Sequence, residues 1–167
     1  MANRTVAYFT ALAIFIVDQL TKWIVTGPLG INEIGDQLKL LPFFDLTYVQ
    51  NKGISLGLLH ADGETGRWLL VAMTALIAIG VAVWISRETR RGDQLALSLI
   101  LGGALGNIVD RVRLGYVTDF ADLHFGTFRP FLVFNVADAA ISIGVVILLI
   151  RAFVIKDKAP EGTNEHA

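Results

Sequence analysis

Four aspartates between positions 110 and 138 could carry acid–base chemistry. They are Asp110, Asp119, Asp122 and Asp138. Two carboxylates held close together in a low-dielectric site cannot both ionise, so they share a proton. One acid then takes a proton from water while the other gives one to a substrate carbonyl or a leaving amine. The residues therefore predict hydrolysis of the aspartic type, and they leave open which two acids form the pair.

Neighbouring charges distinguish these acids. Asp110 is followed by Arg111 and Arg113, so an ion pair that holds a helix end in place is the simplest interpretation of this acid. Asp138 has no basic neighbour in the sequence and is the strongest catalytic candidate. Asp119 lies among apolar residues, where we expect a loop that excludes water and brings this carboxylate over Asp138.

The sequence has few residues that could bind a metal or a cofactor. The chain has no cysteine and three scattered histidines, so we expect neither a metal site nor a cofactor. His60 and His124 are interpreted as ordinary surface or interface histidines. The net charge is −1 and the basic residues are spread along the chain, which argues against nucleic acid as a partner.

The composition indicates that these acids work in a membrane. Hydrophobic residues make up 54% of the 167 positions and charged residues 17%, whereas soluble domains have about 45–50% apolar residues even when glycine is counted. Four stretches are apolar enough to cross a bilayer, the third of them the shortest. They are residues 6–25, 68–85, 95–109 and 131–150. We expect one integral membrane domain over residues 1–155 and a polar, disordered cytoplasmic tail over 156–167.

The distribution of Lys and Arg predicts the orientation of the spans. Arg87, Arg90 and Arg91 crowd the short connection between the second and third spans, while Arg4 precedes the first span and Arg151 follows the fourth. We therefore expect this connection and both termini on the cytoplasmic side, and the two longer connections outside.

The outer connections are expected to have structure of their own. Residues 38–59 are rich in Leu, Phe, Thr, Tyr and Val and carry a turn signal at Asn51-Lys52-Gly53, which predicts a small strand pair on the membrane surface. Residues 116–131 interleave phenylalanines with charged residues, a pattern typical of an interfacial loop or short helix.

Polar residues in three of the spans fall at one level, near the outer surface. They are Asp18, Lys22, Asn107, Asp110, Arg111, Asn135 and Asp138, the last of which would lie about 10 Å inside the fourth span, with Asn135 at about 6 Å. Asp18 and Lys22 have the spacing of a satisfied structural pair. Because ionisable groups in a membrane are costly, such a layer predicts a site that acts on a membrane-bound substrate with water from outside. Gly102 and Gly106 would let the third span approach the fourth closely.

A small transporter or channel component that relays protons through membrane acids is the main alternative. It would need a path of polar groups across the bilayer, but these residues share one depth and the cytoplasmic halves of the spans are nearly free of charge. A membrane scaffold is a third possibility, although a scaffold would not need buried acids.

The same residues occur in segments that resemble the lipoprotein signal peptidases, also called signal peptidase II. The matching segments are Val17-Asp18-Gln19-Leu20-Thr21-Lys22, Asn51-Lys52-Gly53, residues 102–111, Val117-Thr118-Asp119-Phe120 and Phe134-Asn135-Val136-Ala137-Asp138. They follow the order and spacing of the family over most of the chain. The segment from Lys52 to Leu56 departs from the family pattern, which has a threonine and small residues before an aromatic residue.

The resemblance implies an α-helical protein of the bacterial inner membrane, with four transmembrane helices, a small extracytoplasmic β-cradle and a short interfacial helix or loop. It implies an aspartyl protease that removes the signal peptide of diacylglyceryl-modified prolipoproteins, on the amino side of the lipidated cysteine, and that globomycin inhibits. The catalytic pair of the family falls on Asp119 and Asp138. Its supporting residues fall on Asp18, Lys22, Asn51, Asn107, Asp110, Arg111 and Asn135. We expect a monomer whose partners are prolipoproteins and membrane lipid.

Overall fold

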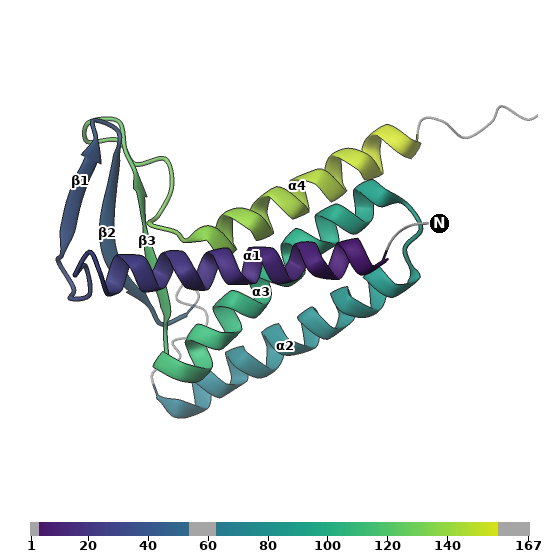
Figure 1. Ribbon diagram of the computed structural model, residues 1–167, viewed down its shortest axis with the longest axis horizontal. Coiled ribbons are helices and arrows are strands. Elements are labelled where there is room, and N and C mark those ends of the chain that lie inside the picture. Colours follow the sequence, from purple (N-terminus) through teal and green to yellow (C-terminus); the bar gives the residue numbers. More distant parts are fainter. Residues whose placement is uncertain (1–3, 54–62, 157–167) are drawn as a thin grey trace, which may run out of the picture.

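Four long helices and a three-stranded sheet form the computed structural model, which describes residues 4–53 and 63–156. The helices are α1 (Arg4–Thr26), α2 (Glu64–Arg87), α3 (Arg91–Leu114) and α4 (Val136–Lys156). Each is long and apolar enough to cross a membrane, so the four predicted spans are confirmed. The helices lie alongside one another, with the sheet at one end of the bundle and the N-terminus at the other (Figure 1).

Two helix boundaries differ from the prediction. Helix α3 has 24 residues and is not the shortest span. Helix α4 begins at Val136 and not at residue 131, so Asn135 and Asp138 lie at its very start, and the helical rise from residue 131 that gave depths of 6 and 10 Å does not apply. The helix cannot start earlier because Phe134 pairs with strand residue Ala121. The Phe134 carbonyl accepts the N–H of Ala121 at 2.7 Å, and the Phe134 N–H donates to the Ala121 carbonyl at 3.1 Å.

Helix α3 is the central helix of the bundle. In its most apolar stretch 50% of the residues are buried inside the protein, against 17–22% in the other three spans. A side chain on Gly102 would meet the Ala11 carbonyl of α1, whereas one on Gly103 would meet the Ala137 carbonyl of α4. Gly106 lies between the two helices, since a side chain there would meet Asp18 of α1 and, at 3.5 Å, Ala137 of α4. The expected close approach of the third span to the fourth is present at Gly103 and Gly106, whereas Gly102 faces α1, because successive residues point about 100° apart around a helix.

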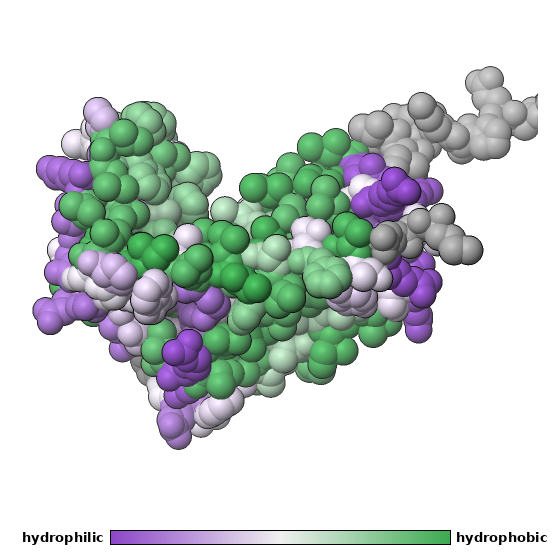
Figure 2. Space-filling model, in the orientation of Figure 1, coloured by the Kyte–Doolittle hydropathy of each residue, from purple (hydrophilic) through white to green (hydrophobic). Residues whose placement is uncertain are grey.

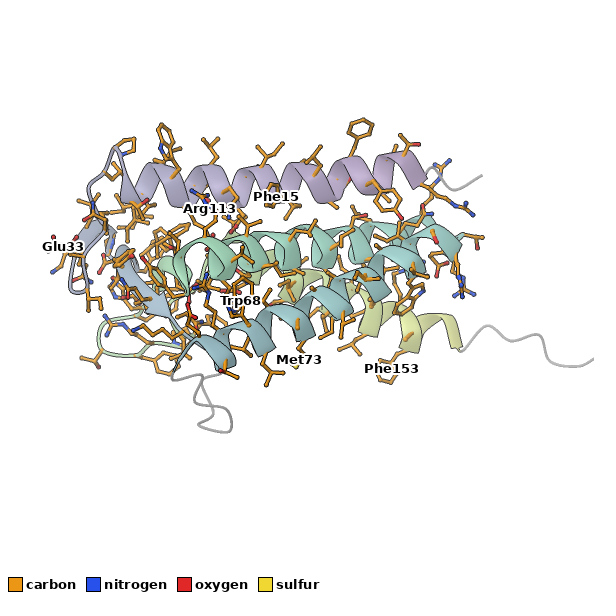
Figure 3. The ribbon with its side chains drawn as sticks, turned by 90° about the horizontal axis from the view of Figure 1, so that it is seen from below. Phe15, Glu33, Trp68, Met73, Arg113 and Phe153 are labelled. Atoms are coloured by element: carbon orange, nitrogen blue, oxygen red, sulfur yellow. The ribbon has the colours of Figure 1, made fainter. Side chains whose placement is uncertain are left out.

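The outer faces of the helices are apolar and exposed. Phe9, Leu76 and Phe153 are each about two-thirds exposed or more, and Figure 2 shows apolar residues along the helices between polar residues at the two ends. Side chains surround the bundle along its length, from Glu33 at the sheet end past Phe15 and Met73 to Phe153 (Figure 3). An exposed apolar belt of this kind is what the acyl chains of a bilayer would cover.

The sheet is antiparallel with the strand order β1-β2-β3. Its strands are β1 (Gln37–Leu41), β2 (Phe44–Asn51) and β3 (Val117–Leu123). The predicted strand pair is confirmed, but its turn lies at Pro42 and Phe43 rather than at Asn51-Lys52-Gly53. Pro42 fits a turn better than a strand because proline has no N–H for the strand ladder. Residues 54–57, His60 and the tail beyond residue 156 lie outside the described residues.

The predicted interfacial loop at 116–131 begins instead as strand β3, which pairs with β2. Gly115 makes this possible: with φ of 86° it ends α3 in the left-handed conformation, and its N–H donates to the Arg111 carbonyl at 3.2 Å. The chain turns there directly into the sheet. As a result Asp119 is held on a strand next to the end of α3, and not on a loop as predicted.

Candidate active site

A buried ion-pair group joins α1 to α3. The Lys22 Nζ lies 2.7 Å from Asp18 Oδ2 and 2.8 Å from Asp110 Oδ2. Gln19 Nε2 donates to Asp110 Oδ1 at 2.9 Å. We call Asp18, Gln19, Lys22 and Asp110 the lysine cluster. Gln19 lies in the matching segment Val17–Lys22 but is not among the predicted site residues. A polar amide beside Asp18 inside a span is the feature of the sequence that indicates it.

The lysine cluster also holds two backbone groups of the neighbouring elements. Asp18 Oδ1 accepts the N–H of Ala137 in α4 at 2.9 Å, and Asp110 Oδ2 accepts the N–H of Thr118 in β3 at 3.1 Å. The predicted pairing of Asp110 with the following arginines is wrong, since Lys22 is its partner. A neighbour one position along a helix points away around the axis, whereas α1 packs directly against this face of α3.

The two other acids are held by amides. Asp119 accepts hydrogen bonds from Asn135 Nδ2 at 2.7 Å and from Asn51 Nδ2 at 3.0 Å. Asp138 accepts one from Asn107 Nδ2 at 2.8 Å. We call Asp119 and Asp138 the amide-held acids. Asp119 is 2% exposed, whereas Asp138 is half-buried.

A reciprocal cap fixes Asp138 at the start of α4. The Asn135 Oδ1 accepts the N–H of Asp138 at 2.9 Å, and Asp138 Oδ2 accepts the N–H of Asn135 at 3.4 Å. This is a capping box, in which the cap residue and the residue three positions on satisfy each other's backbone. Because Asn135 Nδ2 also donates to Asp119, one asparagine contacts both amide-held acids.

The environment of Asp119 favours its protonated form. Burial raises the pKa of Asp119 to about 7, and the negative charge of Asp138 acts in the same direction. The hydrogen bonds from Asn51 and Asn135 oppose this rise. Amides stabilise a carboxylate without neutralising it, so this acid can gain or lose a proton near neutral pH.

Asn107 links the two groups of acids. Its Oδ1 accepts from Lys22 Nζ at 3.3 Å and from Asn135 Nδ2 at 3.2 Å, while its Nδ2 donates to Asp138. Arg111 follows the cluster on α3. Within the described part of the chain, its buried Nε has no hydrogen-bond partner.

The fourth candidate acid belongs to a separate charged group on the sheet. Asp122 accepts the Nε of Arg129 at 3.1 Å and the hydroxyl of Thr47 at 3.2 Å. It lies three positions after Asp119 on β3, so the two side chains point to opposite faces of the strand. His124 is half-buried, and its Nε2 lies 3.0 Å from Asp45 Oδ2 of β2.

Eight of the nine sequence-predicted site residues therefore make direct contacts in two adjoining groups on α1, β2, α3, β3 and the start of α4. They are Asp18, Lys22, Asn51, Asn107, Asp110, Asp119, Asn135 and Asp138. Arg111 is adjacent in sequence and partly buried.

Comparisons with known proteins agree with this arrangement. Residues 10–154 match the sequence profile of the family described as signal peptidase (SPase) II. A lipoprotein signal peptidase of Sphingopyxis alaskensis is 58% identical over 90% of this chain and 86% of the relative. One of Rhizorhabdus wittichii is 50% identical over 99% and 95%, respectively.

A solved structure described as a bacterial membrane enzyme superposes with a TM-score of 0.76 at 30% identity. It covers 98% of this chain and 95% of its own. The transporter interpretation finds no support among these matches. Because the profile and the relatives cover nearly the whole sequence, including both groups of acids, the chain belongs to the signal peptidase II family.

Proposed function

We propose that this membrane peptidase is of the aspartic type, with Asp119 and Asp138 as the catalytic pair. The observation that carries the proposal is the contact of Asn135 with both acids, which holds them beside each other. Among the described residues neither acid takes part in an ion pair, and the charges of Lys22 and Arg111 act on them from further away. In contrast, the carboxylates of the lysine cluster are each within 2.8 Å of the Lys22 amine. Both of these carboxylates are held in ion pairs with one amine that joins α1 to α3, so that cluster is assigned a structural role.

The reaction follows from one proton shared between the two acids. A water molecule between them gives a proton to the ionised carboxylate as its oxygen attacks the scissile carbonyl. The protonated acid gives its proton to the carbonyl oxygen, which forms a neutral tetrahedral intermediate. The acid that took up the water proton then gives it to the amide nitrogen as the C–N bond breaks. The other carboxylate takes a proton from one hydroxyl of the intermediate, which becomes the new carboxyl group, and the pair again holds a single shared proton.

The substrate is inferred to be a prolipoprotein that already carries diacylglyceryl on its cysteine, because the curated relatives are lipoprotein signal peptidases. The amide-held acids lie where the bundle meets the sheet. Acyl chains that remain in the bilayer would keep the scissile bond near this level. Lipid anchoring would thus reduce the entropy that the peptide loses when it binds at the acids.

The decisive assay uses the purified chain in lipid nanodiscs with two forms of one prolipoprotein peptide, with and without diacylglyceryl. We expect cleavage on the amino side of the lipidated cysteine and a far slower reaction of the unmodified form. Equal turnover of both peptides would refute the anchoring argument. Globomycin should inhibit the reaction, and the same preparation gives the oligomeric state by light scattering, where we expect a monomer.

The proposed orientation places both termini on the cytoplasmic side and the sheet outside. Exposed Glu33 on the sheet side and exposed Arg90 at the other end make suitable labelling sites. An impermeant thiol reagent on intact cells should label Glu33→Cys and leave Arg90→Cys unlabelled. The reverse pattern would invert the topology.

A further inference from the structure

A groove at the bundle end opposite the sheet lies between α2 and α4, over the start of α3. Its volume is about 690 Å³. One part of its wall is apolar and comes from α4, with Val145, Leu148 and Leu149, while Trp84 of α2 lies opposite. Val145, Leu149 and Trp84 are each 41–53% exposed, so this wall faces the surroundings of the helices. Along α4 the groove extends from Val145 to Ala152, which is about 10 Å.

The polar end of the groove carries two arginines and two acids, and the acids are already engaged. Asp93 pairs with the Nε of Arg151. The Glu88 carboxylate accepts the backbone N–H groups of Thr89 and Arg90 at 2.8 and 2.9 Å and the Trp84 indole at 3.3 Å. The hydrogen bond from the Arg90 N–H lowers the pKa of Glu88, which keeps this acid ionised and bound to its own turn.

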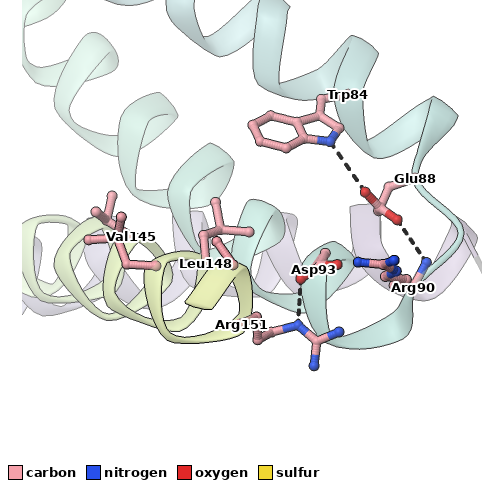
Figure 4. A pocket seen from close by; sticks show the side chains of 9 residues that line it. Trp84, Glu88, Arg90, Asp93, Val145, Leu148 and Arg151 are labelled. Atoms are coloured by element: carbon pink, nitrogen blue, oxygen red, sulfur yellow. Dashed lines mark hydrogen bonds and ion pairs between the residues drawn. The ribbon is translucent and has the colours of Figure 1, made fainter. Parts of the chain in front are cut away.

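The arginines keep donors at the polar end of the groove. Among the described residues, Arg151 donates through Nε to Asp93, and Figure 4 shows its terminal nitrogens pointing away from that acid. Arg90 lines the same pocket and is exposed. A guanidinium offers a planar set of donors that fits a phosphate oxygen pair.

From this combination we infer that the groove binds an anionic phospholipid of the surrounding leaflet, with its phosphate at Arg90 and Arg151 and the upper part of one acyl chain along Val145 and Leu149. An apolar wall that opens to lipid and ends in guanidinium groups complements both parts of such a molecule. The site is separate from the amide-held acids, which lie at the other end of the bundle, and it does not depend on their assignment.

Trp84 gives a direct readout because it lines the groove. The other two tryptophans, Trp23 and Trp68, are 61% and 48% exposed, so a Trp23→Phe/Trp68→Phe variant should fold and leave Trp84 as the single reporter. This variant is placed in phosphatidylcholine nanodiscs that contain a small fraction of phosphatidylglycerol. Bromine on the acyl chains of either lipid quenches the indole on contact.

We expect brominated phosphatidylglycerol to quench Trp84 at least severalfold more, at equal mole fraction, than brominated phosphatidylcholine does. Arg90→Gln should reduce this ratio to near one. Arg87→Gln is the matched control, because it removes the same charge from the same end of the protein but does not line the groove. Both variants should retain full peptidase activity, which shows that they are folded.

Three outcomes would overturn the inference. Equal quenching by the two lipids in the parent protein would mean that the groove does not select an anionic headgroup. An equal loss in Arg87→Gln and Arg90→Gln would assign the effect to general surface charge. Displacement of the brominated lipid by soluble glycerol phosphate at millimolar concentration would identify a site for a free phosphate ester.

Discussion

Two groups of aspartates lie side by side in this protein and are held in different ways. In the lysine cluster, Asp18 and Asp110 share one buried ammonium group. The amide-held acids Asp119 and Asp138 receive their side-chain hydrogen bonds from three asparagines. The same residue type is thus held by an ammonium ion in one group and by amides in the other.

Burial does not distinguish Asp18 in one group from Asp119 in the other, whereas the kind of partner does, and the proposed roles rest on this difference. Asp18 is 0% exposed and Asp119 is 2% exposed, so both are equally removed from solvent. An ammonium ion compensates the cost of burying a carboxylate. An amide compensates only part of it, and the remainder appears as the raised pKa of Asp119.

Substitution of single aspartates by asparagine is the strongest test of the difference between the two groups of acids. Asp119→Asn and Asp138→Asn should each reduce cleavage on the order of 10³-fold or more, because the shared proton is lost. Asp110→Asn leaves one oxygen, which can accept the hydrogen bond of either Gln19 or Thr118 but not both. It should lower stability by about 1–3 kcal/mol while retaining measurable activity. Peptide cleavage and thermal unfolding, measured on the same preparations, provide the comparison.

If Asp119→Asn cleaves normally and Asp110→Asn is folded but inactive, the two roles are exchanged. Binding of globomycin by each variant is the control for an intact site.

Removal of the ammonium group of Lys22 should destabilise the protein at the lysine cluster. Lys22→Met leaves two buried carboxylates without compensation and should lower the free energy of unfolding by about 3–5 kcal/mol. The triple variant Asp18→Asn/Lys22→Met/Asp110→Asn removes the charges together and should recover part of this loss. Denaturant unfolding in detergent measures both. A Lys22→Met protein as stable as the parent would show that the cluster contributes no net stability.

The packing of glycine in α3 gives a smaller effect. Gly103→Ala would push the Ala137 carbonyl away from α3 and thereby shift Asp138 from Asn107. We expect a loss of about 1–3 kcal/mol in stability and a lower cleavage rate. Gly80→Ala in α2 is the matched control, since its new methyl group meets no atom within 4 Å. An equal response of both variants would show that close approach of α3 and α4 does not position the acid.

The pH dependence should show the smallest effect. The pKa of Asp119 in the folded protein is about 7, above the ordinary value of 3.8. Its protonated form therefore stabilises the fold below about pH 4, and this contribution is lost as the pH rises through 7. Asp119→Asn should reduce the fall in melting temperature between pH 4 and 8, with Asp122→Asn as control. Cleavage should decline above about pH 7, when the shared proton leaves.

Asn51→Ala removes a bond that lowers the pKa of Asp119, so the alkaline limb of the rate profile should move to higher pH. A movement to lower pH would contradict the assignment of that limb to Asp119.

Much of the architecture follows from the sequence alone. The four apolar stretches predicted the spans because a bilayer requires long apolar helices, and this requirement is local. The polar residues at one level predicted that three spans meet there. Spacing of three or four positions correctly paired Asp18 with Lys22, since those contacts arise within one helix.

Only the tertiary structure decided which acid has which partner. The sequence places Arg111 beside Asp110, but the packing of α1 on α3 brings Lys22 there instead. Strand β3 could not be distinguished from a loop, because its partner β2 lies more than 60 residues earlier in the chain. The start of α4 depended in the same way on the pairing of Phe134 with Ala121. These contacts join segments far apart in the sequence, and no local pattern of residues records them.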